Sequence, residues 1–251
     1  MDVFNCPFEI VFLELKPPLT DDQLIMMIDS LNGMVTEIRR VEIESATSSM
    51  LELFMNRFRK SIGTLVLHDS DRLVCKRLNF EIKNVFYSDS LKWINLDFLL
   101  SMDTLSISAL SCNLSAKDLN VFLRSWQEGK TNQKLQHIDF MTFEQLDVME
   151  VVKGCGGELM DPRTTKLKYQ GINYAEVGFD IWIHGGIYIR RNDGRLAVIA
   201  TNGHNYGGAE EIIKDIRERN YLDAWDIWNS ENSAEKWNMN KFFIFIDMKE
   251  D

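Results

Sequence analysis

Apolar residues along the chain follow two recurring spacings, one typical of a helix face and one typical of a buried strand. Residues 114–140 contain both. Ser115 and Asp118 have the spacing of a helix capping box, and Gly129 supplies a helix stop. Between them, four apolar residues fall on one helical face: Leu119, Phe122, Leu123 and Trp126. The pattern apolar-x-x-apolar-x-apolar follows at residues 135–140, so a helix followed by a strand is predicted.

The same helix–strand unit occurs near the start of the chain. Thr20 and Gln23 repeat the capping-box spacing, Gly33 repeats the stop, and Ile38–Ile43 repeats the strand pattern. Two matching units about a hundred residues apart indicate an internal repeat.

The strand half of the unit recurs elsewhere, between helical patterns at Ser48–Lys60 and Phe143–Val152. Phe8–Leu15 is a further short apolar strand that stops at two prolines. Helices that alternate with strands able to pair in parallel indicate an α/β fold. We predict an irregular, leucine-rich-repeat-like helix–strand solenoid over residues 1–170. Its other strand patterns are Ile62–Leu67, Cys75–Phe80, Leu91–Leu96 and Met102–Ile107.

The pattern changes near Gln170. Gly178–His184 is strand-like, and residues 187–200 have the pattern of a β-hairpin turning on Asn192-Asp193-Gly194. A helical pattern at Ala209–Arg219 precedes a last strand, Lys241–Met248. Residues 171–251 are therefore predicted to form a small C-terminal antiparallel β part.

Composition narrows the class of protein. Hydrophobic residues make up 45% of the chain and charged residues 26%, which is typical of a folded globular protein. The net charge of −10 disfavours nonspecific binding to nucleic acid or to anionic membranes. No apolar run is long enough for a membrane span, and no signal-peptide pattern is present. The four cysteines are far apart, as expected of free thiols in the cytoplasm or nucleus.

Candidate chemistry is sparse, and no catalytic, cofactor or metal residue is predicted. The glycine-rich loop at residues 202–208 lies between a strand and a helix, where backbone amides can hold a phosphate. An enzyme or small-ligand protein using this loop is the alternative hypothesis, although no phosphate-loop lysine is present. His184 and His204, with Asp180 or Glu210, form a weak metal pattern without helical spacing.

Two motifs resemble a known family. The block Leu119-Asn120-x-Phe122-Leu123-x-x-Trp126, preceded by Trp93, resembles the type 2 F-box-associated domain of the nematode F-box proteins. The segment Arg190-Arg191-Asn192-Asp193-Gly194 resembles that family's Arg-x-Asp-Gly hairpin. The resemblance covers roughly residues 91–199. It implies a substrate-recognition subunit of a cullin-type ubiquitin ligase, in which an F-box docks the ligase core and the associated domain holds the target.

We therefore expect a non-enzymatic protein-binding module that takes an unknown target protein. Arg190, Arg191 and Asp193 are candidate partner contacts. The motif residues are expected to be structural: Trp93, Leu119, Asn120, Phe122 and Trp126. Residues 1–18 are too short for the family's F-box, so docking to a Skp-type linker and cullin ligase is not expected. A third hypothesis is a truncated family member that folds poorly for lack of a cap.

Overall fold

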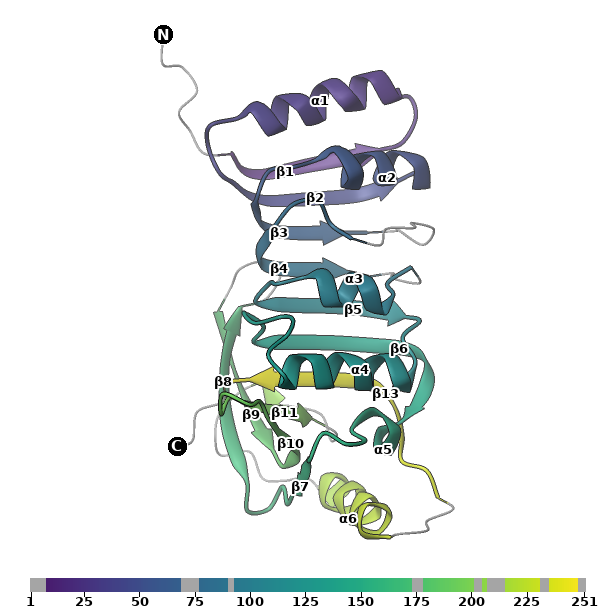
Figure 1. The fold of residues 1–251 in the computed structure, drawn as a ribbon, viewed down its shortest axis with the longest axis vertical. Coiled ribbons are helices and arrows are strands. Elements are labelled where there is room, and N and C mark those ends of the chain that lie inside the picture. The colour runs from purple at the N-terminus through teal and green to yellow at the C-terminus, as the bar shows by residue number, and fades with distance from the viewer. Residues whose placement is uncertain are drawn as a thin grey trace.

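The large sheet has ten strands, of which the first six lie side by side in chain order. The computed structural model describes residues 8–68, 77–89, 93–172, 178–200, 205–206, 215–230 and 235–247. The first six strands pair in parallel (Figure 1). They are β1 (Phe8–Leu15), β2 (Ile38–Ala46), β3 (Ile62–Leu67), β4 (Ile82–Ser88), β5 (Ser106–Cys112) and β6 (His137–Asp147).

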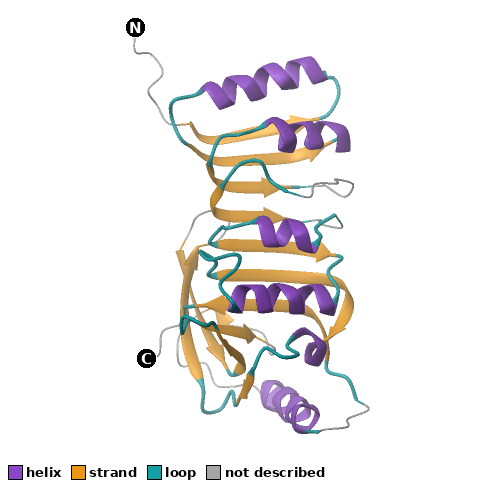
Figure 2. Cartoon of the chain, viewed as in Figure 1, coloured by secondary structure: helices purple, strands orange, loops and turns teal. Residues whose placement is uncertain are grey.

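Helices that lie between these strands or directly after β6 in the sequence cover one face of the sheet (Figure 2). They are α1 (Asp21–Gly33), α2 (Ser48–Arg57), α3 (Leu96–Ser101), α4 (Ala116–Gln127) and the short α5 (Val148–Val151). Connecting two adjacent parallel strands requires a crossover, which a helix commonly provides. The prediction of an α/β fold is confirmed.

Antiparallel strands extend the sheet beyond β6. The order continues as β13 (Asn238–Ile246), β11 (Leu196–Ala200), β10 (Gly186–Arg190) and β7 (Glu158–Met160). The predicted hairpin is confirmed as β10 paired with β11, in a register that places Arg190 opposite Leu196. The boundary predicted near Gln170 falls inside β8, and the large sheet takes strands from both sides of it.

A second, antiparallel sheet packs against the end of the large sheet that contains β11 and β13. It consists of β8 (Lys166–Ile172), β9 (Gly178–His184) and β12 (Asn205–Tyr206). A separate apolar cluster joins the two sheets: Leu167, Tyr169, Ile181 and Ile183 from the small sheet, with Val198, Ala200 and Phe245 from the large one. The last helix, α6 (Asp215–Asn229), lies at the end of the molecule opposite β1 (Figure 1). None of the helices in the described ranges is long and apolar enough to cross a membrane.

Both predicted capping boxes are present. The Thr20 hydroxyl accepts the Gln23 N–H at 3.3 Å, and Gln23 Oε1 accepts the Thr20 N–H at 3.0 Å. Ser115 and Asp118 make the equivalent pair at 3.2 and 2.9 Å. These bonds satisfy amides that have no partner within the helix, so each helix starts where its local sequence dictates.

Two predicted strands are wrong. At Leu91–Leu96, the described residues form a turn followed by the start of α3, where Asn95 Oδ1 accepts the Phe98 N–H at 2.9 Å. At Cys75–Phe80, residues 77–80 are not a strand, and the strand is instead β4, which begins at Ile82. Three apolar positions in six residues also fit a loop or a helix start that buries the same side chains.

Two further boundaries need correction. The strand predicted at Met102–Ile107 begins only at Ser106. Half of the helix predicted at Phe143–Val152 is strand, because β6 runs to Asp147 and α5 is a single turn.

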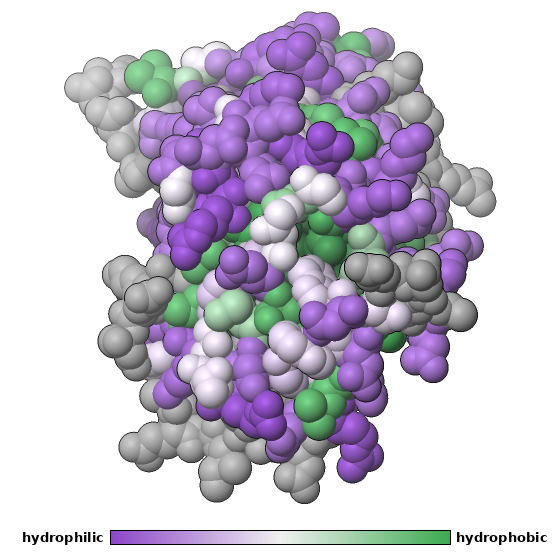
Figure 3. All heavy atoms as spheres, turned by 60° about the horizontal axis from the view of Figure 1, so that its bottom comes forward, coloured by the Kyte–Doolittle hydropathy of each residue, from purple (hydrophilic) through white to green (hydrophobic). Residues whose placement is uncertain are grey.

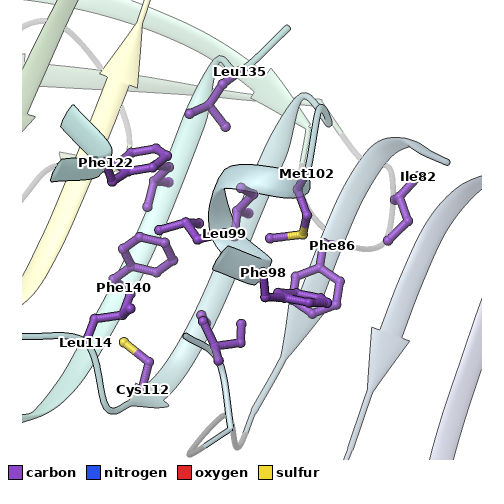
Figure 4. Close-up of a cluster of buried hydrophobic side chains, with 14 of the residues drawn as sticks. Ile82, Phe86, Phe98, Leu99, Met102, Cys112, Leu114, Phe122, Leu135 and Phe140 are labelled. Carbon is purple, nitrogen blue, oxygen red and sulfur yellow. The ribbon is translucent and has the colours of Figure 1, made fainter. Parts of the chain in front are cut away.

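One continuous apolar layer fills the space between the helices and the large sheet. Figure 4 shows its centre, where Phe98 and Leu99 of α3 and Phe122 of α4 lie over the strands that carry Phe86 and Phe140. All five of these side chains have at most 1% of their surface exposed. This layer includes residues of β10, β11 and β13 as well as β1–β6.

Candidate functional site

The side of β1–β4 that faces away from α1 and α2 is here called the helix-free face. The register aligns Glu42 of β2 with Val66 of β3, and Val66 with Tyr87 of β4. Their sequence neighbours Val41 and Leu65 belong to the core under the helices. Because alternate residues of a strand point to opposite faces, Glu42 and Tyr87 lie on the helix-free face.

Four charged or titratable side chains form a chain of contacts on this face, here called the charged cluster. Arg40 Nη2 lies 2.5 Å from Glu42 Oε2, and Glu42 Oε1 lies 3.4 Å from His68 Nε2. His68 Nδ1 lies 2.7 Å from Asp89 Oδ2. His68 and Asp89 directly follow β3 and β4, so the carboxyl ends of neighbouring parallel strands bring the cluster together. The side chains of Arg40 and Glu42 are 15% and 13% exposed, whereas those of His68 and Asp89 are 30% and 35% exposed.

Electrostatics favour the charged form of His68. Partial burial of the ring opposes protonation, but hydrogen bonds and attraction from Asp89 and Glu42 outweigh it and raise the pKa of His68 above 6.5. A protonated His68 would give the cluster an alternating sequence of charges, Arg⁺, Glu⁻, His⁺ and Asp⁻. Such an arrangement offers a partner both signs of charge at fixed positions.

Exposed apolar groups lie beside the cluster. The register places Ile10 of β1 next to Arg40 and Phe12 next to Glu42. Ile10 is 44% exposed and Phe12 is 61% exposed. Both lie on β1, which is an edge strand of the large sheet. An exposed aromatic residue beside partly buried charges is the composition of many protein–protein interfaces.

Asp139 lies on the same side of the sheet, on β6. It is aligned with Phe243 of β13, away from the core residues Ile138 and Phe140. Burial raises the pKa of Asp139 to about 6, against a weaker opposing attraction from Lys241. This carboxyl therefore changes charge close to neutral pH.

The structure places the three predicted partner residues at the hairpin turn, far along the sheet from the charged cluster. Arg190 and Asp193 are exposed, but the Arg191 side chain is only 11% exposed. Its guanidinium lies 3.0 Å from Asp193 Oδ2 and 5.9 Å from the centre of the Trp126 ring. These contacts give Arg191 a structural role, and partner binding by the three residues stays a prediction.

The family-motif residues hold α4 in place. Trp93, Leu119, Phe122 and Trp126 are buried, the least buried being Trp93 at 8% exposed. Asn120 Nδ2 donates to the carbonyls of Val151 and Lys153 at 2.9 and 2.8 Å, which ties α4 to the end of α5. The two motifs also meet each other, because the Asn192 N–H donates to the Gln127 carbonyl at 3.0 Å.

Sequence reasoning missed the charged cluster and Arg195. Arg195 binds both oxygens of Asp247, at 2.8 and 2.5 Å, and donates to the carbonyls of Gln133 and Leu135 at 2.5 and 3.0 Å. It thereby joins the hairpin to residues flanking β6 and β13. The alternation of polar and apolar residues at positions 38–43 predicted that the polar side chains face away from the core. Nothing local predicted which strand would lie beside this one.

Other candidate chemistry finds little support in the described parts of the chain. No three His, Cys, Asp or Glu residues there are placed to hold a metal ion. His204 and most of the loop at residues 202–208 lie outside those parts, and His184 is buried. Cys112 and Cys155 are buried free thiols, and burial raises the pKa of Cys112 to about 11. A thiol with that pKa stays protonated and unreactive at neutral pH.

A second apolar area lies at the other end of the molecule. α6 exposes Leu222 and Trp225, which are 45% and 42% exposed. Figure 3 brings this end forward and shows apolar groups gathered in the middle of a mostly hydrophilic surface. Ion pairs join Arg163 to Asp161 and to Glu218 beside Tyr221 of α6, but these side chains are more exposed than those of Arg40 and Glu42. The helix-free face, which also carries the more exposed aromatic residue Phe12, is therefore the stronger candidate.

Residues 75–140 match the family model described as F-box associated. The matched region extends from the segment before β4 to the first residues of β6 and includes α3 and α4. The match confirms the resemblance found in the block around Leu119–Trp126, whereas the hairpin at residues 189–199 lies outside it. No curated protein and no solved structure matches the chain.

Proposed function

We propose that this chain is a non-enzymatic protein-binding module that holds a target protein against its helix-free face. The observation that carries the proposal is the charged cluster beside the exposed residues Ile10 and Phe12. A partner can bury the apolar pair while it meets Arg40, Glu42, His68 and Asp89 with complementary charges. The F-box-associated region supports a protein partner, and a role as a ubiquitin-ligase substrate adaptor is part of this proposal.

In the described part of the chain, the hydrogen bonds of the His68 ring go to Asp89 and Glu42 rather than to a serine, threonine or cysteine, which supports binding over catalysis. His68 between two carboxylates could act as a base, but a hydrolase also needs a nucleophile within hydrogen-bond reach. Ser88, which directly precedes Asp89, is buried on the core side of β4.

The arrangement of the first six strands supports a leucine-rich-repeat-like solenoid as part of the same proposal. Each strand lies beside its predecessor in parallel, and the described helices between these strands lie on one face. Solenoids commonly bind their partners on the face that the strands form.

A matched pair of substitutions tests which face binds. Phe12 on the helix-free face and Met26 on α1 are both exposed apolar residues, at 61% and 63%. We expect proteins that the immobilised full chain captures from a cell lysate to be lost with Phe12→Ser and retained with Met26→Ser. His68→Gln should weaken the same captures, because it removes the imidazole ring that bridges Glu42 and Asp89.

Circular dichroism spectra and melting temperatures must show that each variant is folded. If every captured protein stays bound to both Phe12→Ser and His68→Gln, the helix-free face is not the binding surface. If the full chain, correctly folded, captures no protein above a bare-resin control, the protein-binding proposal fails altogether.

A further inference from the structure

A cavity of about 570 Å³ opens at the amino-terminal edge of β3, β4 and β5, away from the charged cluster. Its lining includes the apolar side chains of Phe80, Ile82 and Met102, which are 9%, 4% and 4% exposed. Figure 4 shows Ile82 and Met102 at this end of the sheet, beside the core. This volume is in the range of small-molecule sites and is large enough for one or two amino-acid side chains.

The charges around the cavity favour an anion. Glu81 and Asp103 line it, but both are engaged by Lys134, whose Nζ lies 2.9 Å from Glu81 Oε1 and 3.9 Å from Asp103 Oδ2. The Lys134 backbone N–H also donates to Asp103 Oδ1 at 2.9 Å. Arg59 lines the cavity too, and none of the carboxylates in the described ranges pairs with its guanidinium.

Arg59 therefore has side-chain N–H groups available to bind an anion. Its Nη1 donates to the Phe58 carbonyl at 2.7 Å, and its other side-chain donors have no acceptor among the described residues. A guanidinium pairs well with a carboxylate, because two of its N–H groups can reach both oxygens. A phosphate would meet the same Arg59, but it has no apolar body to fill the space beside Phe80 and Met102.

Thr104 provides an independent sign of a ligand. It lines the cavity and is 1% exposed, and its Oγ1 has no hydrogen-bond partner within the described structure. A buried hydroxyl without a partner is costly, so native proteins usually pair it. Because Oγ1 is enclosed, the Thr104 side chain must turn toward the cavity to hydrogen-bond to a ligand, and that bond would remove the cost.

We propose that this cavity binds a carboxylate attached to an apolar body, with Arg59 holding the carboxylate and Thr104 bonding a polar atom of the ligand. The apolar body lies against Phe80 and Met102. Such a ligand is either a free organic acid or an acidic side chain of a peptide flanked by apolar residues. The site is separate from the helix-free face and does not depend on it.

Two probes distinguish the sources, each with a neutral counterpart. Phenylacetate and phenylacetamide represent the free acid, and a blocked tetrapeptide with a central glutamate between leucines is compared with its glutamine version. Binding to the full chain is measured by calorimetry or by NMR chemical-shift changes. We expect at least one acid to bind about tenfold or more tightly than its neutral counterpart, as one charge-assisted contact provides.

Substitutions locate the binding. Arg59→Gln should weaken it about tenfold, whereas Arg57→Gln, which removes a nearby arginine that pairs with Asp29 outside the cavity, should change it less than about twofold. Thr104→Val should also weaken binding yet raise the melting temperature of the unliganded protein, because it removes the unpaired hydroxyl.

Preference for phenylacetate assigns the cavity to a free acid, and preference for the glutamate peptide assigns it to a protein segment. Either result supports the site. The proposal is overturned if neither acid binds at millimolar concentration, if Arg59→Gln binds as wild type, or if inorganic phosphate binds more tightly than both acids.

Discussion

Thr20 and Ser115 each fix the start of a helix through a local hydrogen bond, whereas the contacts of His68 depend on distant parts of the chain. Each cap bonds to a residue three positions away, so the relevant partner is visible in the sequence itself. His68 bonds to Glu42 and Asp89, which are 26 and 21 residues away. Only the pairing of β2, β3 and β4 brings these three side chains together, so the charged cluster could not be predicted locally.

The first prediction concerns the pH dependence that His68 confers. Its raised pKa means that the folded state binds the proton more tightly than the unfolded state. The resulting stabilisation is fully present below the unfolded pKa of about 6.5 and is lost as the pH rises through the higher folded pKa. We expect His68→Gln to remove this decrease in the free energy of unfolding. Urea unfolding at a series of pH values from below 6.5 to above the folded pKa measures it.

The surroundings of His68 provide the control. Glu42, Asp89 and Tyr87 face it, and Arg40 reaches it through Glu42. Asp89→Asn should reduce the same pH dependence without abolishing it, because Glu42 remains. Asp139, whose pKa burial raises to about 6, also titrates near the lower end of this range, so the difference between wild type and His68→Gln isolates the contribution of His68. A wild-type protein equally stable on both sides of pH 6.5 would show that the contacts around His68 are not maintained in solution.

At the scale of elements, the caps and the hairpin turn were predicted well. The strand patterns placed β1, β2, β3 and β6 correctly but failed at Cys75–Phe80 and Leu91–Leu96. The starts of α1 and α4 and the hairpin β10–β11 depend on local bonding, and the sequence placed all three. The segment at Leu91–Leu96 failed because burial alone does not distinguish a strand from a helix start. Trp93 and Ile94 are buried as the pattern requires, but Asn95 caps α3. β4 was missed because its apolar residues follow a different spacing.

The second prediction concerns α4, which the F-box-associated match includes. Trp126 is 1% exposed and lies between the core and the guanidinium of Arg191. Trp126→Ala should therefore lower the free energy of unfolding by about 3–5 kcal/mol, as expected for a large buried aromatic residue. Chemical denaturation measures it. Val121→Ala on the same helix, at a position 39% exposed, should change it by less than about 0.5 kcal/mol. Similar small effects of both substitutions would show that α4 is not held by its buried face.

At the scale of the whole molecule, the pairing of β13 with β6 joins the two parts of the sequence into one sheet, and no local pattern predicts it. β13 crosses back from the C-terminal part to pair with β6, and β11 and β10 follow it in the sheet. Hydrophobic spacing indicates which side of a strand is buried, but it does not indicate which strand lies beside it. The sequence therefore predicted the helix–strand alternation and the hairpin, but it did not show that they share a sheet.

The last prediction follows from this shared sheet. Phe242 and Ile244 of β13 belong to the same apolar layer as Ile138 and Phe140 of β6. A fragment of residues 1–170 would lose β13 and expose the pairing edge of β6, so we expect it to aggregate or to bind apolar dyes. The full chain should unfold in urea as one transition, with the same midpoint by circular dichroism and by tryptophan fluorescence. A fragment 1–170 that unfolds cooperatively on its own would instead mean that the boundary near Gln170 separates two independent units.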